Sequence, residues 1–169
     1  MEKNYWAIHM GQYNMYANLA YNEGFIAIGW NEIGEDLSKY RNLDKGAFFK
    51  FLRPIVEKVY AGHSKGSRGQ SIGQIYRFTN LMKTGDIVLM PQTKEGKVFA
   101  GILEDEYYYD DKPKDKCPYF HRRKVKWVKV IDLNDVPQEL KYTLGSIMTV
   151  FSINHHSQVI ESLISDQMI

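Results

Sequence analysis

The order of strand-like and helix-like segments is the feature that most constrains how this chain of 169 residues can fold. Apolar runs typical of strands occupy residues 5–11, 25–30, 87–92, 97–110, 121–133 and 146–153, and helical patterns occupy residues 13–24, 44–60, 72–82, 137–142 and 154–167. Because the two kinds of segment do not alternate regularly, a doubly wound parallel sheet is disfavoured. The pattern predicts one α+β domain, residues 1–169, with a curved, mostly antiparallel sheet or small barrel flanked by helices.

Local signals sharpen several of these elements. The segment "TKEG" is expected to join two strands as a hairpin. Gly24 is expected to cap the end of the first helix, whereas Asp44 and Asn154 are placed to cap helix starts. Pro54 is expected to kink or divide the helix at residues 44–60. The stretch "AGHSKGSRGQSIG", residues 61–73, holds four glycines and predicts a flexible loop.

Charge and composition limit the class of protein. The net charge is +2, from 22 basic and 20 acidic residues, so any contact with nucleic acid requires local clusters of basic side chains. Aromatic residues make up 14% of the chain, and tyrosine is favoured on recognition surfaces. The single cysteine, Cys117, excludes an internal disulfide and fits a reducing cytoplasm. We find no signal peptide in "MEKNYWAIHMG" and no membrane-length apolar stretch, so we expect a cytoplasmic protein without membrane contact.

The search for catalytic motifs favours a binding protein over an enzyme. The five histidines lack the spacing of metal ligands, and Cys117 carries no mark of an activated nucleophile, so we expect neither a metal nor a cofactor. Asp86, Glu95 and Lys97 match the Asp…Glu-x-Lys pattern of metal-dependent nucleases. Because the last two fall on a hairpin tip, where ligands are poorly preorganised, a nuclease is the less favoured alternative.

Two further stretches leave alternatives open. The segment "GHSKGSRGQSIG" lacks the Gly-Lys-Ser/Thr ending of a phosphate loop, but its Lys65 and Arg68 either grip an anion or are simply solvated. Trp30 stands where the strand-like run "FIAIGW" meets the polar loop "NEIGEDLSKY". A tryptophan at such a position either packs into the core or waits for a flat, partly apolar ligand.

Six segments resemble, in this order, the N-terminal recognition domains of modification-dependent restriction proteins of the McrB and Mrr kinds. They are "YWAIHMG", "GFIAIGWNEIGEDLSKY", "GQIYRFTNLMKTGDIVLMPQ", "VFAGILEDEYYYDD", "HRRKVKWVKVI" and "LGSIMTVFSI", and together they cover about residues 4–160. Those domains belong to the PUA-like superfamily, alongside the EVE and YTH domains. The resemblance implies a PUA-like fold and a module that binds a modified, often methylated base in DNA. Any nuclease or NTPase would then be a separate domain or subunit, and YTH relatives make RNA the alternative partner.

The resemblance also implies an aromatic cage for a base that leaves the helical stack. Trp30 occupies the place of the cage tryptophan that follows a "GVW" strand in YTH domains, and Gly29 would let a base plane approach. In "EYYYDD", strand alternation places Tyr107 and Tyr109 on one face, where one of them is expected to form a second wall. Trp6 is either a further cage residue or part of the core.

Candidate contacts to the base edge and to phosphates complete the expected site. The base edge would be read by Asn31, Ser71, Gln74 or Asn80, with Asp36 and Asp110 as weaker options. Phosphates would be held by Lys65, Arg68, Arg122, Lys124 and Lys126, of which the last three share one face of "HRRKVKWVK". Such contacts predict binding that weakens as salt rises.

Overall fold

The computed structural model describes residues 2–165, and the last two residues of the helix expected at 154–167 lie outside this range. The strands are β1 (Tyr5–Ile8), β2 (Phe25–Ile28), β3 (Ile87–Gln92), β4 (Lys97–Leu103), β5 (Tyr108–Tyr109), β6 (His121–Asp132) and β7 (Val150–Ser152). The helices are α1 (Ala17–Glu23), α2 (Lys45–Val59), α3 (Lys65–Tyr76), α4 (Gln138–Leu144) and α5 (Ser157–Ser165). A π-helical turn, Arg77–Leu81, continues α3.

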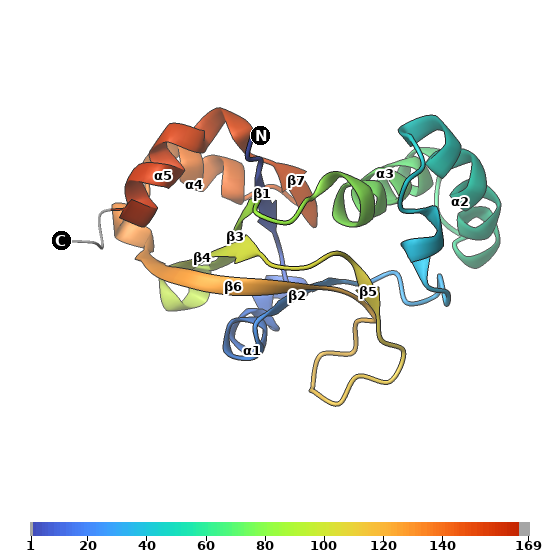
Figure 1. Cartoon of the computed structure of the whole chain (residues 1–169), viewed down its shortest axis with the longest axis horizontal. Helices are drawn as coiled ribbons and strands as arrows, with labels where there is room; N and C mark the ends of the chain where they lie inside the picture. Colours follow the sequence, from blue (N-terminus) through green and yellow to red (C-terminus); the bar gives the residue numbers. More distant parts are fainter. Residues whose placement is uncertain (1, 166–169) are drawn as a thin grey trace.

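The fold is α+β, as the sequence predicts, with a strongly curled mixed sheet that forms a half-barrel flanked by helices. The strand order is β2-β6-β4-β3-β1-β7, and β5 pairs with the start of β6. Neighbouring strands are antiparallel except β1 and β3, which are parallel. Figure 1 shows α4 and α5 at one end of the sheet and α2 and α3 at the other. None of the helices in the described range is long and apolar enough to cross a membrane.

The long strand β6 bends where its pairing with β4 slips. The register shifts between Ala100 and Gly101, which is a β-bulge. A Cβ at Gly101 would lie 2.4 Å from Val125 Cγ1 and 2.7 Å from Trp127 Cε3, so only glycine fits there. Because a bulge bends a strand and increases its twist, this position lets β6 pair with β4 along one half and with β2 along the other.

Two hydrophobic clusters use opposite faces of the sheet. In β1, Trp6 and Ile8 join the cluster beneath α1, α2 and α3, whereas Tyr5 and Ala7 join the cluster beneath α4 and α5. This alternation is the period of two that a strand imposes on its side chains. A sheet covered on both faces explains why the strand runs in the sequence are almost continuously apolar.

Several local predictions are confirmed. The hairpin β3–β4 turns through Thr93–Glu95 and through Gly96, whose φ is 67°. Gly24 ends α1 with φ 76°, and the Asp44 carboxylate accepts a hydrogen bond from the Ala47 amide at 2.8 Å. Pro54 lies within α2, which runs undivided from Lys45 to Val59, so the alternative that this proline divides the helix is wrong. The Pro54 side chain lies on the exposed side of the helix. Water can therefore hydrogen-bond to the carbonyl group that receives no hydrogen bond from the proline nitrogen.

Two local predictions are wrong. The glycine-rich segment 61–73 is not a loop, because α3 begins at Lys65 with Ser64 as its cap and buries Ile72 and Ile75. Tertiary burial here overrides the low helix propensity of glycine. Asn154 does not cap α5, which starts at Ser157. Its side-chain oxygen instead accepts a hydrogen bond from the Tyr5 amide at 2.7 Å and fixes the edge of β1.

Candidate functional site

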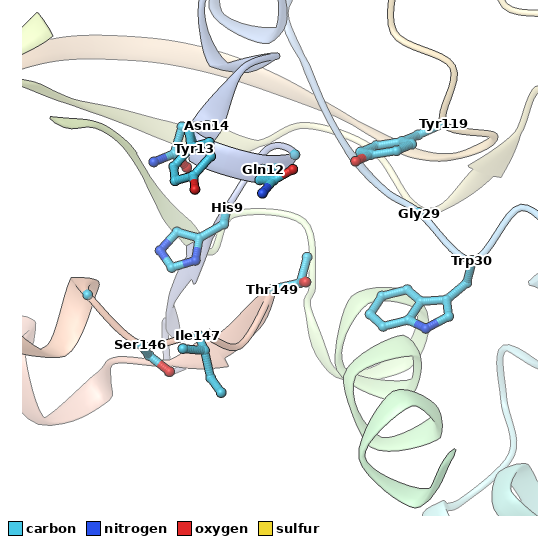
Figure 2. Close-up of a pocket in the computed structure, with 12 residues that line it drawn as sticks. His9, Gln12, Tyr13, Asn14, Gly29, Trp30, Tyr119, Ser146, Ile147 and Thr149 are labelled. Carbon is cyan, nitrogen blue, oxygen red and sulfur yellow. The ribbon is translucent and has the colours of Figure 1, made fainter. Parts of the chain in front are cut away.

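A cavity of about 650 Å³ opens where β1 and β2 end. Its volume lies within the range of small-molecule and cofactor sites. Four segments meet around it: the turn after β1, the end of β2, the segment before β6 and the connection from α4 to β7 (Figure 2). The lining residues are His9, Gly11, Gln12, Tyr13, Asn14, Gly29, Trp30, Tyr119, Gly145, Ser146, Ile147 and Thr149.

Two aromatic side chains, Trp30 and Tyr119, face this cavity from either side of Gly29 (Figure 2). Both rings are half-buried and rest against the core, so each keeps a firm position and an open surface. The Tyr16 ring packs edge-on against Tyr119, with 5.3 Å between ring centroids. A Cβ at Gly29 would approach Tyr119 Cε1 to 3.7 Å, so the glycine leaves open a space that a methyl group would fill.

Backbone strain is concentrated at the same cavity. In the described part of the chain, three residues other than glycine have a left-handed backbone: Tyr13 (φ 56°), Asn14 (φ 57°) and Trp30 (φ 59°). All three line the cavity. A left-handed conformation costs a residue other than glycine roughly 1–3 kcal/mol, and such residues cluster at ligand sites. For Trp30 the strain places the indole at the cavity instead of continuing the buried strand.

The side of the cavity opposite the two rings is polar but carries no formal charge. His9 lies there, and its Nε2 is 2.8 Å from the Leu144 carbonyl oxygen. Because a carbonyl oxygen only accepts, Nε2 holds the proton in the neutral ring and Nδ1 is left as an acceptor. Ser146 and Thr149 lie beside this ring (Figure 2). Among the described lining residues there is no Lys, Arg, Asp or Glu.

Of the residues expected to form the cage, Trp30 alone lines the cavity. Trp6 is 5% exposed, and its indole N–H donates to the Asp86 carboxylate at 2.9 Å. Tyr107 is 4% exposed, and its hydroxyl lies 2.7 Å from His121 Nδ1 and accepts from the Leu37 amide at 3.1 Å. We correct both predictions, because a ring covered by the core offers no face to a ligand. Tyr109 packs against Phe120 and His121, away from the cavity.

Burial also sets the ionisation of this neighbouring cluster. It raises the pKa of the Tyr107 hydroxyl and lowers the pKa of the His121 imidazole. The tyrosine is therefore a neutral hydrogen-bonding group at neutral pH, and the histidine is held in its neutral form. Tyr107 and His121 thus form a buried structural pair.

Two of the residues expected to read the base edge, Asn31 and Gln74, bind segments that form the walls of the cavity. The side-chain NH₂ group of Asn31 donates to the Pro118 carbonyl at 2.8 Å, and its side-chain oxygen accepts from the Phe120 backbone amide at 3.1 Å. These two hydrogen bonds position Tyr119, which lies between Pro118 and Phe120. Gln74 is buried, and its oxygen accepts from the Thr149 amide at 2.6 Å and from the Val150 amide at 3.1 Å.

Asn80 and Ser71 do not reach the cavity either. The Asn80 amide donates to the Tyr40 and Leu43 carbonyls at 3.0 and 3.2 Å, and Ser71 is half-buried on α3. None of the four residues offered as alternatives for reading the base edge, Asn31, Ser71, Gln74 or Asn80, lines this cavity. Two of them, Asn31 and Gln74, are positioning residues for it.

The basic residues divide into a buried ion pair and exposed cations. Arg122 is 3% exposed, and its guanidinium binds both oxygens of Asp115 at 2.6 and 2.9 Å and covers the Phe25 ring. It holds the pKa of the Asp115 carboxyl below its usual range. The prediction that Arg122 is a phosphate contact is therefore corrected, because its donors are already used.

The other predicted phosphate contacts lie outside the cavity. Lys124 and Lys126 are exposed on β6, and the Lys124 ammonium is 4.0 Å from Asp105. Lys65 and Arg68 line a separate, smaller cavity of about 120 Å³ between α2 and α3. These four cations remain accessible to a long ligand, but they do not build the ring-lined site.

The nuclease pattern is not assembled in space. Asp86 is buried and accepts hydrogen bonds from the Trp6 indole and from the amides of Asn4 and Lys83. Glu95 and Lys97 lie at the hairpin tip, at the other end of β3. At ~3.3 Å per residue, a strand of six residues separates them by roughly 20 Å. In the described range no cluster of His, Cys, Asp and Glu is arranged to hold a metal ion.

Tyr119 and His9 are the important residues that sequence reasoning missed. Tyr119 follows Pro118 in a charged loop, and His9 follows a buried strand. The aromatic residue in "CPYFH" was the available signal for Tyr119, but only the tertiary contacts of Asn31 bring it to Trp30. His9 carried no local signal beyond its position at a strand end.

Fold and cavity together describe an α+β domain with a ring-lined cavity whose described lining residues include no Lys, Arg, Asp or Glu. A family model described as "Domain of unknown function (DUF8426)" matches residues 6–154, so the chain belongs to that family. The match includes every residue that lines the pocket. A search of curated proteins found no match to this chain.

Proposed function

We propose that this protein is a nucleic-acid-binding module that recognises a modified, methylated base in DNA by taking the extruded base into the pocket between Trp30 and Tyr119. The observation that carries the proposal is the pair of open aromatic rings, Trp30 and Tyr119, in a cavity where Trp30, Tyr13 and Asn14 have a left-handed backbone. In this proposal the fold is a member of the PUA-like superfamily. The curled sheet flanked by helices is compatible with the EVE and YTH resemblance of the six sequence segments.

The magnitudes favour a base as the occupant. Stacking a base on an aromatic side chain contributes roughly 1–3 kcal/mol. Two rings can therefore offset the few kcal/mol that extrusion of a base from a duplex requires. A methyl group adds only about 0.8 kcal/mol through burial, so discrimination also needs a close wall. Tyr119 provides such a wall, because the space between its ring and Gly29 would just accommodate a methyl-sized group such as a Cβ.

The polar side of the pocket supplies hydrogen bonds to the base edge. His9 Nδ1 is an acceptor in the neutral ring, and the hydroxyls of Ser146 and Thr149 can donate or accept. A site of this kind, apolar on one side with a few oriented polar groups on the other, is typical of specific small-ligand recognition. An uncharged lining suits a neutral base better than a charged metabolite.

Phosphate contacts outside the pocket would add affinity without sequence preference. The exposed Lys124, Lys126 and Lys65 and the half-buried Arg68 are candidates. A net charge of +2 predicts modest affinity from this domain alone. In the proposal the domain is the targeting part of a modification-dependent restriction system in the cytoplasm, and cleavage or NTP hydrolysis is performed by another domain or subunit.

The test is a titration of labelled duplexes that differ only in one base: cytosine, 5-methylcytosine, 5-hydroxymethylcytosine, adenine or 6-methyladenine. We expect tighter binding to one of the modified duplexes and at least a tenfold loss of that preference in Trp30→Ala. Trp127→Ala is the matched control, because this half-buried indole contacts the same core outside the pocket. Equal affinity for all duplexes would refute the proposal. Preferential competition by an RNA of the same sequence would favour an RNA reader instead.

A further inference from the structure

A second cavity, of about 510 Å³, adjoins the pocket at the turn after β1. The two cavities share Gln12, Tyr13 and Asn14. The second one continues to Met15 and to the β3–β4 hairpin, where Gln92, Lys94 and Glu95 line it. Both cavities are lined by the turn after β1. A ligand that extends from the first cavity across Tyr13 therefore reaches the second.

The turn between the cavities presents an apolar surface that the protein itself does not cover. Tyr13 is 71% exposed and Met15 is 64% exposed. The left-handed backbone of Tyr13, with φ 56°, keeps its ring outside the core. An exposed aromatic ring held by a strained backbone is an expected feature of a contact surface for a flat ligand.

A cation lies over one face of the Tyr13 ring. The Lys94 ammonium lies 5.2 Å from the centroid of Tyr13. Among the described residues that line the two cavities, it is the one Lys or Arg. The nearby Glu95 carboxylate is occupied, because it accepts from the Asn18 amide and lies 3.8 Å from the Lys97 ammonium. The lining of the second cavity therefore holds one cation, Lys94, and one carboxylate, Glu95, whose charge is balanced by the neighbouring Lys97.

We propose that the second cavity holds the nucleotide next to the extruded base, with its base stacked on Tyr13 and its phosphate beside Lys94. This inference rests on the proposed function, and it specifies the ligand as a strand of nucleic acid instead of a free base or nucleoside. The chemistry agrees: the first cavity is uncharged, as a base requires, and the second combines a ring with a cation, as a nucleotide with its phosphate requires.

The site is preformed, which supports the same conclusion. Gln92 is 6% exposed, and its amide donates to the Asn14 carbonyl at 3.3 Å and to the Asn18 side-chain oxygen at 3.4 Å. These contacts tie the turn after β1 to β3. A ligand that stacks on Tyr13 would therefore not have to order the turn first.

The experiment compares two probes by fluorescence anisotropy and calorimetry. One is a single-stranded pentanucleotide with the modified base that the wild-type protein prefers, chosen among 5-methylcytosine, 5-hydroxymethylcytosine and 6-methyladenine, at its centre. The other is the corresponding modified nucleoside. Because Tyr13 also lines the first cavity, we expect Tyr13→Ala to weaken binding of the pentanucleotide roughly tenfold more than it weakens binding of the nucleoside. Tyr13→Phe should retain the affinity, and Lys94→Gln should reduce the dependence of binding on salt concentration.

Tyr142→Ala is the matched control, because Tyr142 is 81% exposed and lies outside both cavities. Unchanged pentanucleotide binding in Tyr13→Ala, or an equal loss for pentanucleotide and nucleoside, would overturn the inference. If the nucleoside still binds and Trp30→Ala abolishes that binding, the proposed base pocket stands while the second cavity falls. If the wild-type protein binds neither probe, both proposals fail.

Discussion

Two groups of aromatic residues lie near the start of β6, and they differ in how their polar side chains are used. The β5–β6 cluster contains Tyr107, His121 and Arg122, whose side chains are buried and hydrogen-bonded to protein groups such as the Leu37 amide and Asp115. The pocket contains Trp30 and Tyr119, whose rings are partly open and whose surroundings include the strained residues of the chain. Aromatic composition is similar, but the first cluster stabilises the fold and the second leaves a surface free.

The difference teaches how a structural aromatic residue is distinguished from a candidate ligand contact. In the β5–β6 cluster, the hydroxyl of Tyr107 is hydrogen-bonded and both ring faces are covered. In the pocket, Trp30 accepts a left-handed backbone and keeps one face in an open cavity. Natural proteins retain such strain where it serves a site, so the pocket is where loss of function should separate from loss of stability.

The largest expected effect distinguishes two tyrosines. Tyr107→Ala should lower the free energy of unfolding by about 4 kcal/mol, because it leaves a large cavity and removes the partner of His121 and of the Leu37 amide. Tyr119→Ala should lower it by only about 1–2 kcal/mol, because that ring is already half-exposed, yet it should abolish the preference for a modified base. Urea unfolding measures the free energy of unfolding of both variants. Equal destabilisation would remove the contrast between the clusters.

A smaller effect comes from pH. Burial lowers the native pKa of His121, so the unfolded chain binds a proton first as the pH falls below about 6.5. The stability that depends on neutral His121 is fully present above that pH and is lost as the pH falls toward the lower native pKa. We expect a decrease of up to about 1.4 kcal/mol per pH unit in that window.

Urea unfolding at a series of pH values from 7.5 to 5.5 checks this expectation, with His121→Gln as the variant that should flatten the profile. Burial and the neighbouring His155 also lower the pKa of His156, so His156→Gln removes a second part of the slope. An unchanged profile in the His121→Gln variant would show that the buried pair does not titrate as its burial requires.

The smallest expected effect tests the strain at the pocket. Tyr13 and Met15 are both exposed, but Tyr13 has φ 56° and Met15 has φ −62°. Glycine relieves the left-handed conformation at position 13 and only adds chain entropy at position 15. Tyr13→Gly should therefore be more stable than Met15→Gly by about 1 kcal/mol, as measured by thermal unfolding. The reverse order would mean that the turn is not strained.

Elements set by neighbouring residues were predictable from the sequence. The hairpin at "TKEG", the cap by Asp44 and the end of α1 at Gly24 depend on a few adjacent side chains, and the structure has all three. The start of α3, residues 65–71, was predicted as a loop, because glycines hide a helix that is held by burial of Ile72 and Ile75 against α2. In the candidate site, Trp30 lines the cavity, whereas the sequence pointed to Tyr107, Tyr109 and Trp6 for the other rings and not to Tyr119.

The amino-acid sequence by itself determined the strands, most of the helices and the mixed α+β class, because apolar periodicity and caps act over a few residues. Only the tertiary structure decided which rings stay open. Asn31 meets Pro118 and Phe120 across 87 and 89 positions of sequence, and those contacts place Tyr119 opposite Trp30. The exposure of a ring depends on partners that are distant along the chain, so no local pattern can distinguish the tryptophan that lines the pocket from the one that fills the core.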